Sequence, residues 1–342
     1  MTTTVLLTGG TGFLGGHIVP ALQHAGHRVR ALVRGHPGAL PALGAETVRG
    51  DVLDPRALDA AMQGVDVVVH AAGLVSRERA DTRVMMQLNV QGTRHVVEAA
   101  CRAGVKRVVH VSTSGTVAVG EEPKVFHEDD EPPLALIHRW PYYLSKLLAE
   151  KAARDALRLS SSTTKPDLVT LLPTLTLGPG DARGSSTEDV RRFLDRAIPF
   201  VPTGGLSFVD VRDVAVAVAL VIARGAPGER YLLSALNLTF QDFFRRLETV
   251  SGVRGPAIPF AVPKLFSRLG ASLIERAAET LGTKAPVSSL EAEMASCFWY
   301  VDARKATEEL GFTTRDPQKT LLDTVRSLRG EKVGMRAVER SA

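Results

Sequence analysis

The chain is poor in cysteine, with only Cys101 and Cys297 among its 342 residues. Two cysteines so far apart, without a second pair, give neither a disulfide framework nor a zinc-finger spacing. No cluster of His, Cys and Asp has the spacing of a zinc site, so no bound metal is expected. The composition fits a reducing compartment.

Long apolar runs are also missing. The longest, residues 214–223, is far below the roughly 18 residues that a membrane-spanning helix needs. The N-terminus lacks a basic region and leads directly into a strand-like run, so a signal peptide is not expected. We therefore expect a cytoplasmic protein without a transmembrane segment.

The chain carries little net charge outside its C-terminal end. Residues 326–342 hold five Lys/Arg and two Glu, which accounts for three of the five net positive charges. We expect this segment to be a basic, flexible tail. Since the rest of the chain is close to neutral, it has no basic stripe for nucleic acid, and no nucleic-acid partner is expected.

Short apolar strands alternate with helical stretches through the first half. The predicted strands are "TVLLTG", "HRVRALVR", "AETVRGD", "DVVVHAAG" and "KRVVHVST". Their nearly continuous apolar character is typical of parallel strands buried on both faces, and amphipathic helical stretches separate them. This alternation predicts an α/β fold with a doubly wound parallel sheet. Two later strands, "DLVTLLP" and "GERYLLS", extend it.

Three glycines connect the first strand to the first helix. Gly9, Gly12 and Gly15 stand three apart in "TVLLTGGTGFLGGHIV", and Gly10 offers a second register of the same pattern. Glycines there let the backbone approach a pyrophosphate, which then meets the free N–H groups at the helix start. We assign these glycines, with Phe13 and Leu14 between them, to a dinucleotide site of a Rossmann domain.

The ends of the next two strands indicate which dinucleotide binds. An acid that would bind the ribose hydroxyl of NAD is expected about 20 residues on, but no Asp or Glu lies between Gly26 and Ala45. Arg34 closes the second strand instead, and its guanidinium can pair with a 2′-phosphate. Asp51, followed by Val52, is placed to bond the adenine amine. We therefore expect NADP(H), although an exposed strand-end arginine is the simpler alternative.

The stretch "WPYYLSK" (140–146) opens a predicted helix with Pro141 in its first turn. Tyr142 and Lys146 are four apart and share a face, whereas Tyr143 points off it. An ammonium near a phenol lowers its pKa, which would make Tyr142 a general acid–base. By itself the pair also fits an exposed helix surface.

Together these motifs resemble the extended short-chain dehydrogenases/reductases, in the branch of dihydroflavonol-reductase-like and 3β-hydroxysteroid-dehydrogenase-like proteins. The glycine loop, "HVSTSGTVAVG" (110–120) and Tyr142-x-x-x-Lys146 carry the resemblance, and "HAAG", "LNVQGT", "PTLTLGPGD" and "FVDVRDVA" follow in family order. It implies that Tyr142 is the proton donor or base, and that Lys146 holds the nicotinamide ribose. It also implies a hydroxyl that orients the substrate oxygen; Ser112, Thr113 and Ser114 compete, and family spacing favours Ser114.

The resemblance assigns further residues to the site. Asn89 matches an asparagine that supports a proton-relay water, with capping or packing as the alternative. Ala71, Ala72 and Gly73 of "HAAG" are assigned to the cofactor, as are Pro173 and Thr174 on its nicotinamide side. Leu172 stands where the family usually has an arginine. The resemblance also implies a homodimer formed through helices at 82–103 and 141–158.

The expected organisation has two parts. Residues 1–173 form the Rossmann domain, to which 209–235 return, and 174–208 with 236–325 form a small, mainly helical substrate lobe. Arginines at 183, 191, 192 and 196 are read as a solvated helix face, and Phe193, Phe200, Val201 and Phe208 as either a substrate wall or core. Residues 258–282 are expected to be a core helix, with a lid, a partner face or a membrane contact as alternatives. His17, His70 and His110 are expected to be packing residues.

These expectations converge on an NADP(H)-dependent oxidoreductase that reduces a ketone or aldehyde, or oxidises the alcohol, on a mainly apolar small molecule. A nucleotide-sugar epimerase or dehydratase with tightly bound NAD is one alternative. Dehydratases usually carry an acid beside the active-site hydroxyl, and "STSG" has none. A non-catalytic NADP-sensing or scaffold protein is the other, but such relatives typically lose the tyrosine–lysine pair.

Overall fold

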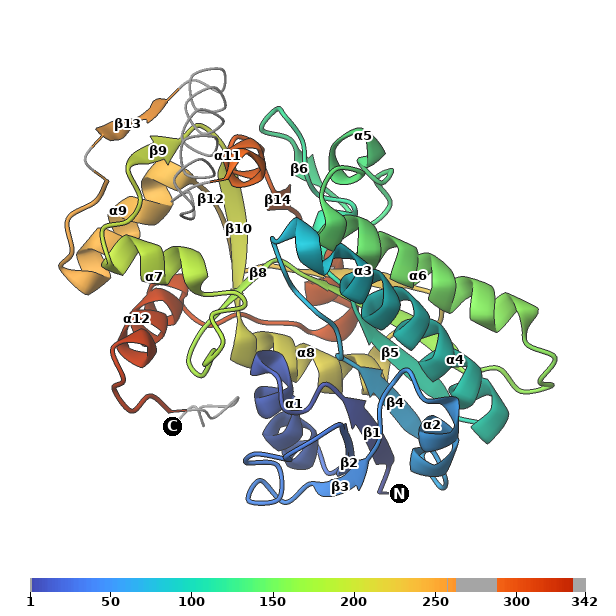
Figure 1. Ribbon diagram of the computed structural model, residues 1–342. Coiled ribbons are helices and arrows are strands. Elements are labelled where there is room, and N and C mark those ends of the chain that lie inside the picture. The colour runs from blue at the N-terminus through green and yellow to red at the C-terminus, as the bar shows by residue number, and fades with distance from the viewer. Residues whose placement is uncertain (1, 257, 263–287, 335–342) are drawn as a thin grey trace.

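A parallel sheet of seven strands forms the centre of the molecule (Figure 1). The computed structural model describes residues 2–256, 258–262 and 288–334. Across the sheet the strands are β11 (Arg230–Leu233), β7 (Asp167–Pro173), β5 (Arg107–Val111), β4 (Val67–His70), β1 (Thr4–Thr8), β2 (Arg28–Val33) and β3 (Glu46–Arg49). The central strands are buried throughout because their apolar side chains alternate between two covered faces.

Helices cover both faces of this sheet (Figure 1). One face packs against α1 (Phe13–His24) and α8 (Val211–Arg224). The other packs against α2 (Pro55–Ala61), α4 (Gly92–Ala103) and α6 (Pro141–Leu159). The chain builds β1, β2 and β3 outward and then returns to place β4 beside β1. The predicted doubly wound fold is thereby confirmed, and ligands of such sheets bind where the strand order reverses.

A second, smaller lobe packs over the carboxyl ends of the strands (Figure 1). Its helices are α7 (Glu188–Leu194), α9 (Phe240–Ser251), α11 (Ser289–Ala295) and α12 (Pro317–Leu328). It also contains a three-stranded sheet of β12 (Leu236–Thr239), β10 (Gly205–Asp210) and β8 (Leu175–Leu177), and the pair β9 (Phe200–Pro202) with β13 (Ile258–Val262). The sequence predicted a mainly helical lobe and did not reveal these strands; β10 is buried along its whole length, so it lacks the alternation of apolar and polar residues that marks a half-buried strand.

Small elements join these two parts. They are η1 (Arg79–Asp81), α3 (Thr82–Met85), the π-helix η2 (Met86–Gln91), η3 (Ser114–Thr116), β6 (Val125–Phe126), α5 (Leu134–Ile137), β14 (Tyr300–Val301) and the π-helix η4 (Ala306–Leu310). Strand β11, which follows α8, pairs with β7 and so returns the chain to the main sheet after the first part of the lobe. Among the described residues, no helix is both long and apolar enough to cross a bilayer.

Two sequence expectations fall partly outside the described residues. The segment 258–282 contributes the backbone of β13, and its residues 263–282 are not described. The predicted tail boundary at 326 cuts through α12, which continues to Leu328. After it, Arg329 still donates a hydrogen bond to the Ser251 carbonyl at 2.7 Å, so the start of the predicted tail packs against the lobe.

Candidate active site

A cavity of about 660 Å³ lies between the carboxyl ends of the strands and the lobe. The glycine loop and the start of α6 line one side, and side chains of α7, α9 and α11 line the other. Most of the predicted site residues border it, namely Gly9, Gly12, Phe13, Leu14, Gly15, Ala71, Gly73, Ser114, Tyr142, Lys146, Pro173 and Thr174. Arg34, Asp51, Val52, Ala72 and Asn89 are not part of its lining.

The glycine loop has room only for backbone. Gly9 has a φ of +79°, and a Cβ there would lie 2.6 Å from the Ala71 carbonyl. A Cβ at Gly15 would lie 2.2 Å from the Gly9 oxygen, so the helix presses directly on the loop. Helix α1 starts after Gly12 without a side-chain cap, which leaves N–H groups of its first turn facing the cavity. This cradle fits a dinucleotide pyrophosphate.

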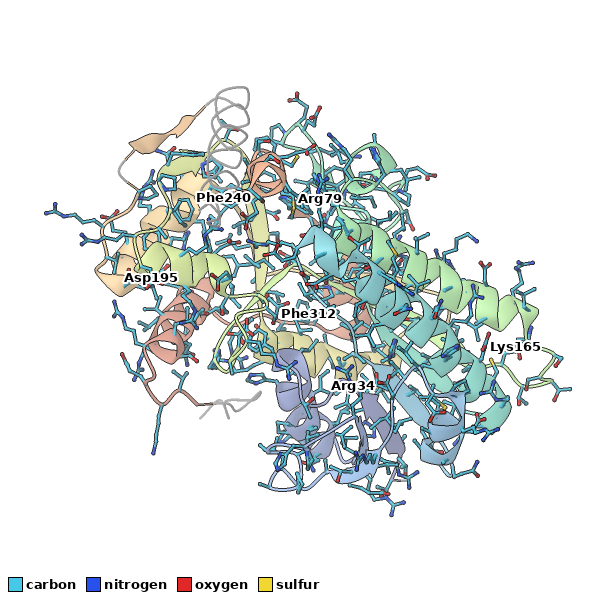
Figure 2. All side chains as sticks on the ribbon, in the orientation of Figure 1. Arg34, Arg79, Lys165, Asp195, Phe240 and Phe312 are labelled. Carbon is cyan, nitrogen blue, oxygen red and sulfur yellow. The ribbon has the colours of Figure 1, made fainter. Side chains whose placement is uncertain are left out.

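Arg34 and Asp51 stand at the ends of β2 and β3, beyond the cavity. The Arg34 side chain is 66% exposed, and its Nη1 is 4.0 Å from Oδ2 of Asp51, too far for a hydrogen bond. Asp51 accepts from the Leu53 N–H at 2.9 Å, and Val52 is buried beneath α4. Arg34 lies on the sheet half of the molecule, whereas Phe240 lies on the lobe (Figure 2). The guanidinium is thus available to a ligand that continues outward from the glycine loop.

Helix α6 brings Tyr142 and Lys146 to the cavity. Lys146 is buried, its Nζ donates to the Val111 carbonyl at 2.6 Å, and burial lowers its pKa to about 8. Burial raises the pKa of Tyr142 well above its ordinary value, and Tyr143 adds to the rise. Burial therefore sets the direction of the net change in this pKa, and the lowering by Lys146 that the sequence suggested stays a prediction. The phenol is protonated at neutral pH, which is the form that can donate.

The three competing hydroxyls have different surroundings. Ser112 donates to a buried carboxylate of Glu150 at 2.6 Å. Thr113 borders the cavity beside Tyr142, and its side chain opposes the rise that burial causes in the phenol's pKa. Ser114 borders the cavity at the start of η3. Strand alternation does not decide which of these three side chains share a face, because β5 ends at Val111 and the chain turns.

Asn89 lies in the π-helix η2 and is buried. Its amide accepts from the Leu74 N–H at 2.8 Å and donates to the Leu74 carbonyl at 3.0 Å. It also donates to Ser145 Oγ at 2.9 Å. The side chain therefore ties the segment after β4 to helix α6, one residue before Lys146. These contacts fit the packing role that the sequence left open, the wider turn of a π-helix aims the side chain there, and support of a proton-relay water stays a prediction.

The buried histidines support the sheet. His70 Nδ1 is 2.7 Å from Thr8 Oγ1 and its Nε2 is 3.0 Å from Thr93 Oγ1. Thr8 in turn accepts from the Ala72 N–H at 3.2 Å, which fixes the segment that the sequence assigned to the cofactor. Burial lowers the pKa of His70 to about 3. His110 stacks on His70 with ring centroids 5.5 Å apart, so these residues pack as expected.

Aromatic residues form one wall of the cavity. Tyr143 is 4.9 Å from Trp299 between ring centroids, and Trp299 stacks on Trp140 at 5.4 Å. Gly115 makes room for this cluster, because a Cβ there would lie 2.3 Å from the Tyr143 ring. Phe200 and Phe240 line the opposite side. Of the phenylalanines predicted as either wall or core, Phe193 and Phe208 belong to the core of the lobe.

Charged residues close the cavity in a set that the sequence did not reveal. Arg77, after β4, binds both oxygens of Asp189 in α7, at 2.9 and 2.7 Å. Its Nη1 is 3.2 Å from Oε1 of Glu291 in α11, and Arg192 reaches the same oxygen at 3.1 Å. The predicted solvated face is wrong for Arg192, whose side chain is 18% exposed, because Glu291 draws it inward. The partners lie about a hundred residues or more apart in the sequence, so no local pattern joins them.

A dinucleotide cradle at the switch point of a doubly wound sheet, next to a Tyr–Lys pair that borders the same cavity, defines an NAD(P)-dependent oxidoreductase of the extended short-chain dehydrogenase/reductase class. The chain belongs to the NAD dependent epimerase/dehydratase family, whose pattern its residues 5–234 match. It is therefore an enzyme of a family that uses a nicotinamide cofactor on small-molecule substrates.

Several known proteins are similar over almost the whole chain. A dihydroflavonol 4-reductase-like protein of Synechocystis sp. is 32% identical over 334 residues, covering 95% of this chain and 94% of the relative. The 4-hydroxy-2-methyl-3-oxo-4-farnesyl-3,4-dihydroquinoline-1-oxide ketoreductase of Stigmatella aurantiaca is 29% identical and covers 94% and 95%. The crystal structure of gox2253 superposes with a TM-score of 0.81 at 30% identity, covering 96% and 98%.

Proposed function

We propose that the protein reduces a ketone or aldehyde on a mainly apolar small molecule with NADPH, or oxidises the corresponding alcohol. The observation that carries this proposal is the position of the half-buried Tyr142, which borders the cavity one helical turn from the buried Lys146. The glycine loop and Lys146 would hold the cofactor, and nicotinamide supplies hydride when it is bound.

The chain's own residues would handle the proton and the oxygen. Tyr142 donates its phenolic proton to the carbonyl oxygen as negative charge develops there. A neighbouring hydroxyl donates a second hydrogen bond to the same oxygen and so stabilises that charge. The Lys146 ammonium, anchored on the Val111 carbonyl, holds the nicotinamide ribose and favours the phenolate that remains after proton transfer. The aromatic wall excludes water.

For the second hydroxyl we propose Thr113, with Ser114 as the alternative that family spacing favours. The position of Thr113 supports this choice, since its side chain borders the cavity and lies close enough to Tyr142 to lower the phenol's pKa. Thr113→Val, which keeps the shape, should lower kcat by about a hundredfold, as loss of one oxyanion donor does. Ser114→Ala is the matched control and should lower kcat much less. The reverse order, measured by steady-state kinetics, would return the role to Ser114.

The cavity lining supports an apolar substrate. The aromatic wall gives a ring system flat surfaces to pack against, and Arg77 and Arg192, which border the cavity, are paired with carboxylates. A nucleotide sugar would need unpaired cations to bind its diphosphate. The third arginine that lines the cavity is Arg183, and it is exposed to solvent, so the cavity does not offer the diphosphate a buried, unpaired arginine. The ketoreductase relative, whose name includes a farnesyl group, is consistent with this reading.

The nucleotide that accompanies the purified protein separates the proposal from an epimerase. A reductase exchanges its cofactor in every turnover, so native mass spectrometry should show the chain free of nucleotide or carrying NADP(H) that dialysis removes. An epimerase regenerates its cofactor in place and would retain NAD through dialysis. Retained NAD, without NADPH oxidation by any carbonyl compound, would contradict the proposal.

The protein should form a homodimer through α3, η2, α4 and α6. Val84 on α3 and Leu148 on α6 are 51% and 37% exposed, which gives this face apolar side chains to bury. Light scattering at micromolar concentration should give the dimer mass, and Leu148→Glu should shift it to the monomer. Leu322→Glu, at an equally exposed leucine on α12, should remain dimeric. A wild-type monomer would contradict this prediction. A cytoplasmic location also remains a prediction.

A further inference from the structure

Helix α6 carries a third functional candidate on the face of Tyr142 and Lys146. Glu150 follows Lys146 by four residues, as Lys146 follows Tyr142, so all three side chains lie along one face. The Glu150 side chain is 1% exposed. Burying a carboxylate is costly unless partners compensate its charge. Its position under the active site therefore needs an explanation beyond the helix itself.

The partners of Glu150 come from three elements. Its Oε1 accepts the Ser112 hydroxyl at 2.6 Å, just after β5. Its Oε2 lies 3.1 Å from Nη2 of Arg230 on β11 and 3.7 Å from Nη1 of Arg154 on α6. Arg230 is shared, because the same Nη2 also donates to Thr116 Oγ1 at 3.2 Å. The carboxylate is held in place by these partners, and although two cations flank it, its negative charge still acts on Lys146.

The negative charge of Glu150 acts on the ammonium group of Lys146. Burial lowers the pKa of Lys146 to about 8, and the negative charge of Glu150 is the influence that opposes this fall. Three other titratable groups face the lysine. His70 on β4 and His110 on β5 are uncharged at neutral pH, because burial lowers both pKa values far below 6.5. Tyr142 is uncharged as well. Glu150 is thus the anion that supports the ammonium.

We propose that Glu150 is a positioning residue whose buried carboxylate keeps Lys146 an ammonium ion at neutral pH, through charge rather than direct contact with the reactants. A lysine that lost its proton would neither favour a phenolate nor donate fully to ribose hydroxyls. This proposal rests on the proposed function, because the positive charge of Lys146 affects the rate only if the protein carries out the proposed reduction. The effect on Lys146 itself can be measured without cofactor, substrate or turnover.

The direct test is an NMR titration of protein labelled at the lysine side-chain nitrogen, with the Lys146 signal assigned from Lys146→Arg. Glu150→Gln keeps an acceptor for Ser112 and removes the charge. It should lower the pKa of Lys146 by about one unit or more, the usual effect of an opposite charge within a few ångströms. Ser112→Ala, which removes the hydrogen bond and keeps the charge, should leave this pKa close to wild type. An unchanged pKa in folded Glu150→Gln would overturn the proposal.

A second variant covers the case in which Glu150→Gln does not fold. Arg154 is 53% exposed, so Arg154→Gln should fold, and it removes a cation that weakens the Glu150 field. The pKa of Lys146 should then rise by a few tenths of a unit at low salt, where screening is weakest. Because Arg154 also repels Lys146 directly, Glu150→Asp is measured beside it: it keeps the charge and changes the packing, so the pKa of Lys146 should stay within a few tenths of a unit of wild type, and a fall of about one unit or more would overturn the proposal. If carbonyl reduction is found, the alkaline limb of kcat/KM should move in the same directions.

Discussion

Tyr142→Phe should lower kcat for carbonyl reduction by about 10²–10⁴, the range expected when a positioned general acid is lost. Burial keeps the phenol protonated at neutral pH, and phenylalanine retains the ring but has no proton to give. Binding of NADPH, followed by fluorescence titration, should change little because the glycine loop and Lys146 are untouched. Steady-state kinetics with an active carbonyl compound measures both effects.

Tyr143→Phe is the matched control, since the same hydroxyl is removed one residue away. The Tyr143 ring packs on Trp299 and would still do so in the variant. Its hydroxyl lies near the charges of Arg77 and Asp189, so a change in KM is expected while kcat stays close to wild type. If both variants kept full kcat, Tyr142 would not be the acid.

Arg34→Ala should weaken NADPH binding by about ten- to a hundredfold and leave NADH nearly unchanged. A hydrogen bond between charged groups contributes about 1.5–3 kcal/mol, which corresponds to that range. The structure supports this reading because the Arg34 guanidinium has Asp51 only at 4.0 Å and is free to turn toward a phosphate. Dissociation constants for both nucleotides, measured by calorimetry, give the comparison.

Arg49→Ala controls for the loss of a positive charge, because Arg49 ends the neighbouring strand β3 and is also exposed. It should weaken NADPH binding far less than Arg34→Ala does. Equal weakening of NADPH and NADH by Arg34→Ala would show that this arginine does not read the 2′-phosphate, and the cofactor prediction would then be wrong.

Local patterns were sufficient for the sheet and for the parts of the site that lie at strand ends. Parallel strands must be apolar on both faces, and a pyrophosphate loop must be glycine, so "TVLLTGGTGFLGG" determines both. The structure adds the reason for each glycine, because Gly9 and Gly15 face backbone at distances that exclude a Cβ. The Tyr142–Lys146 pairing followed from helical spacing, since four residues make nearly one turn.

Long-range contacts and burial could not be read from the sequence. The placement of Thr113 beside Tyr142 depends on where β5 ends, and strand ends are poorly determined by pattern. The raised pKa of Tyr142 depends on how deeply the phenol is buried, which spacing alone does not show. Arg77 meets Asp189 and Glu291 only after the lobe has folded over the sheet. Such contacts are tertiary, and they decide what the cavity accepts.

The central claim is that this site passes hydride from NADPH to a carbonyl carbon while Tyr142 protonates the oxygen. The most direct measurement uses NADPH carrying deuterium at the transferable position and a panel of apolar ketones and aldehydes, with the products examined by mass spectrometry. The proposed reaction predicts alcohols that contain one deuterium at the former carbonyl carbon, formed by wild type and not detectably by Tyr142→Phe. Deuterium that stays on the nucleotide across the panel, with wild-type protein shown to bind NADPH, would contradict the claim.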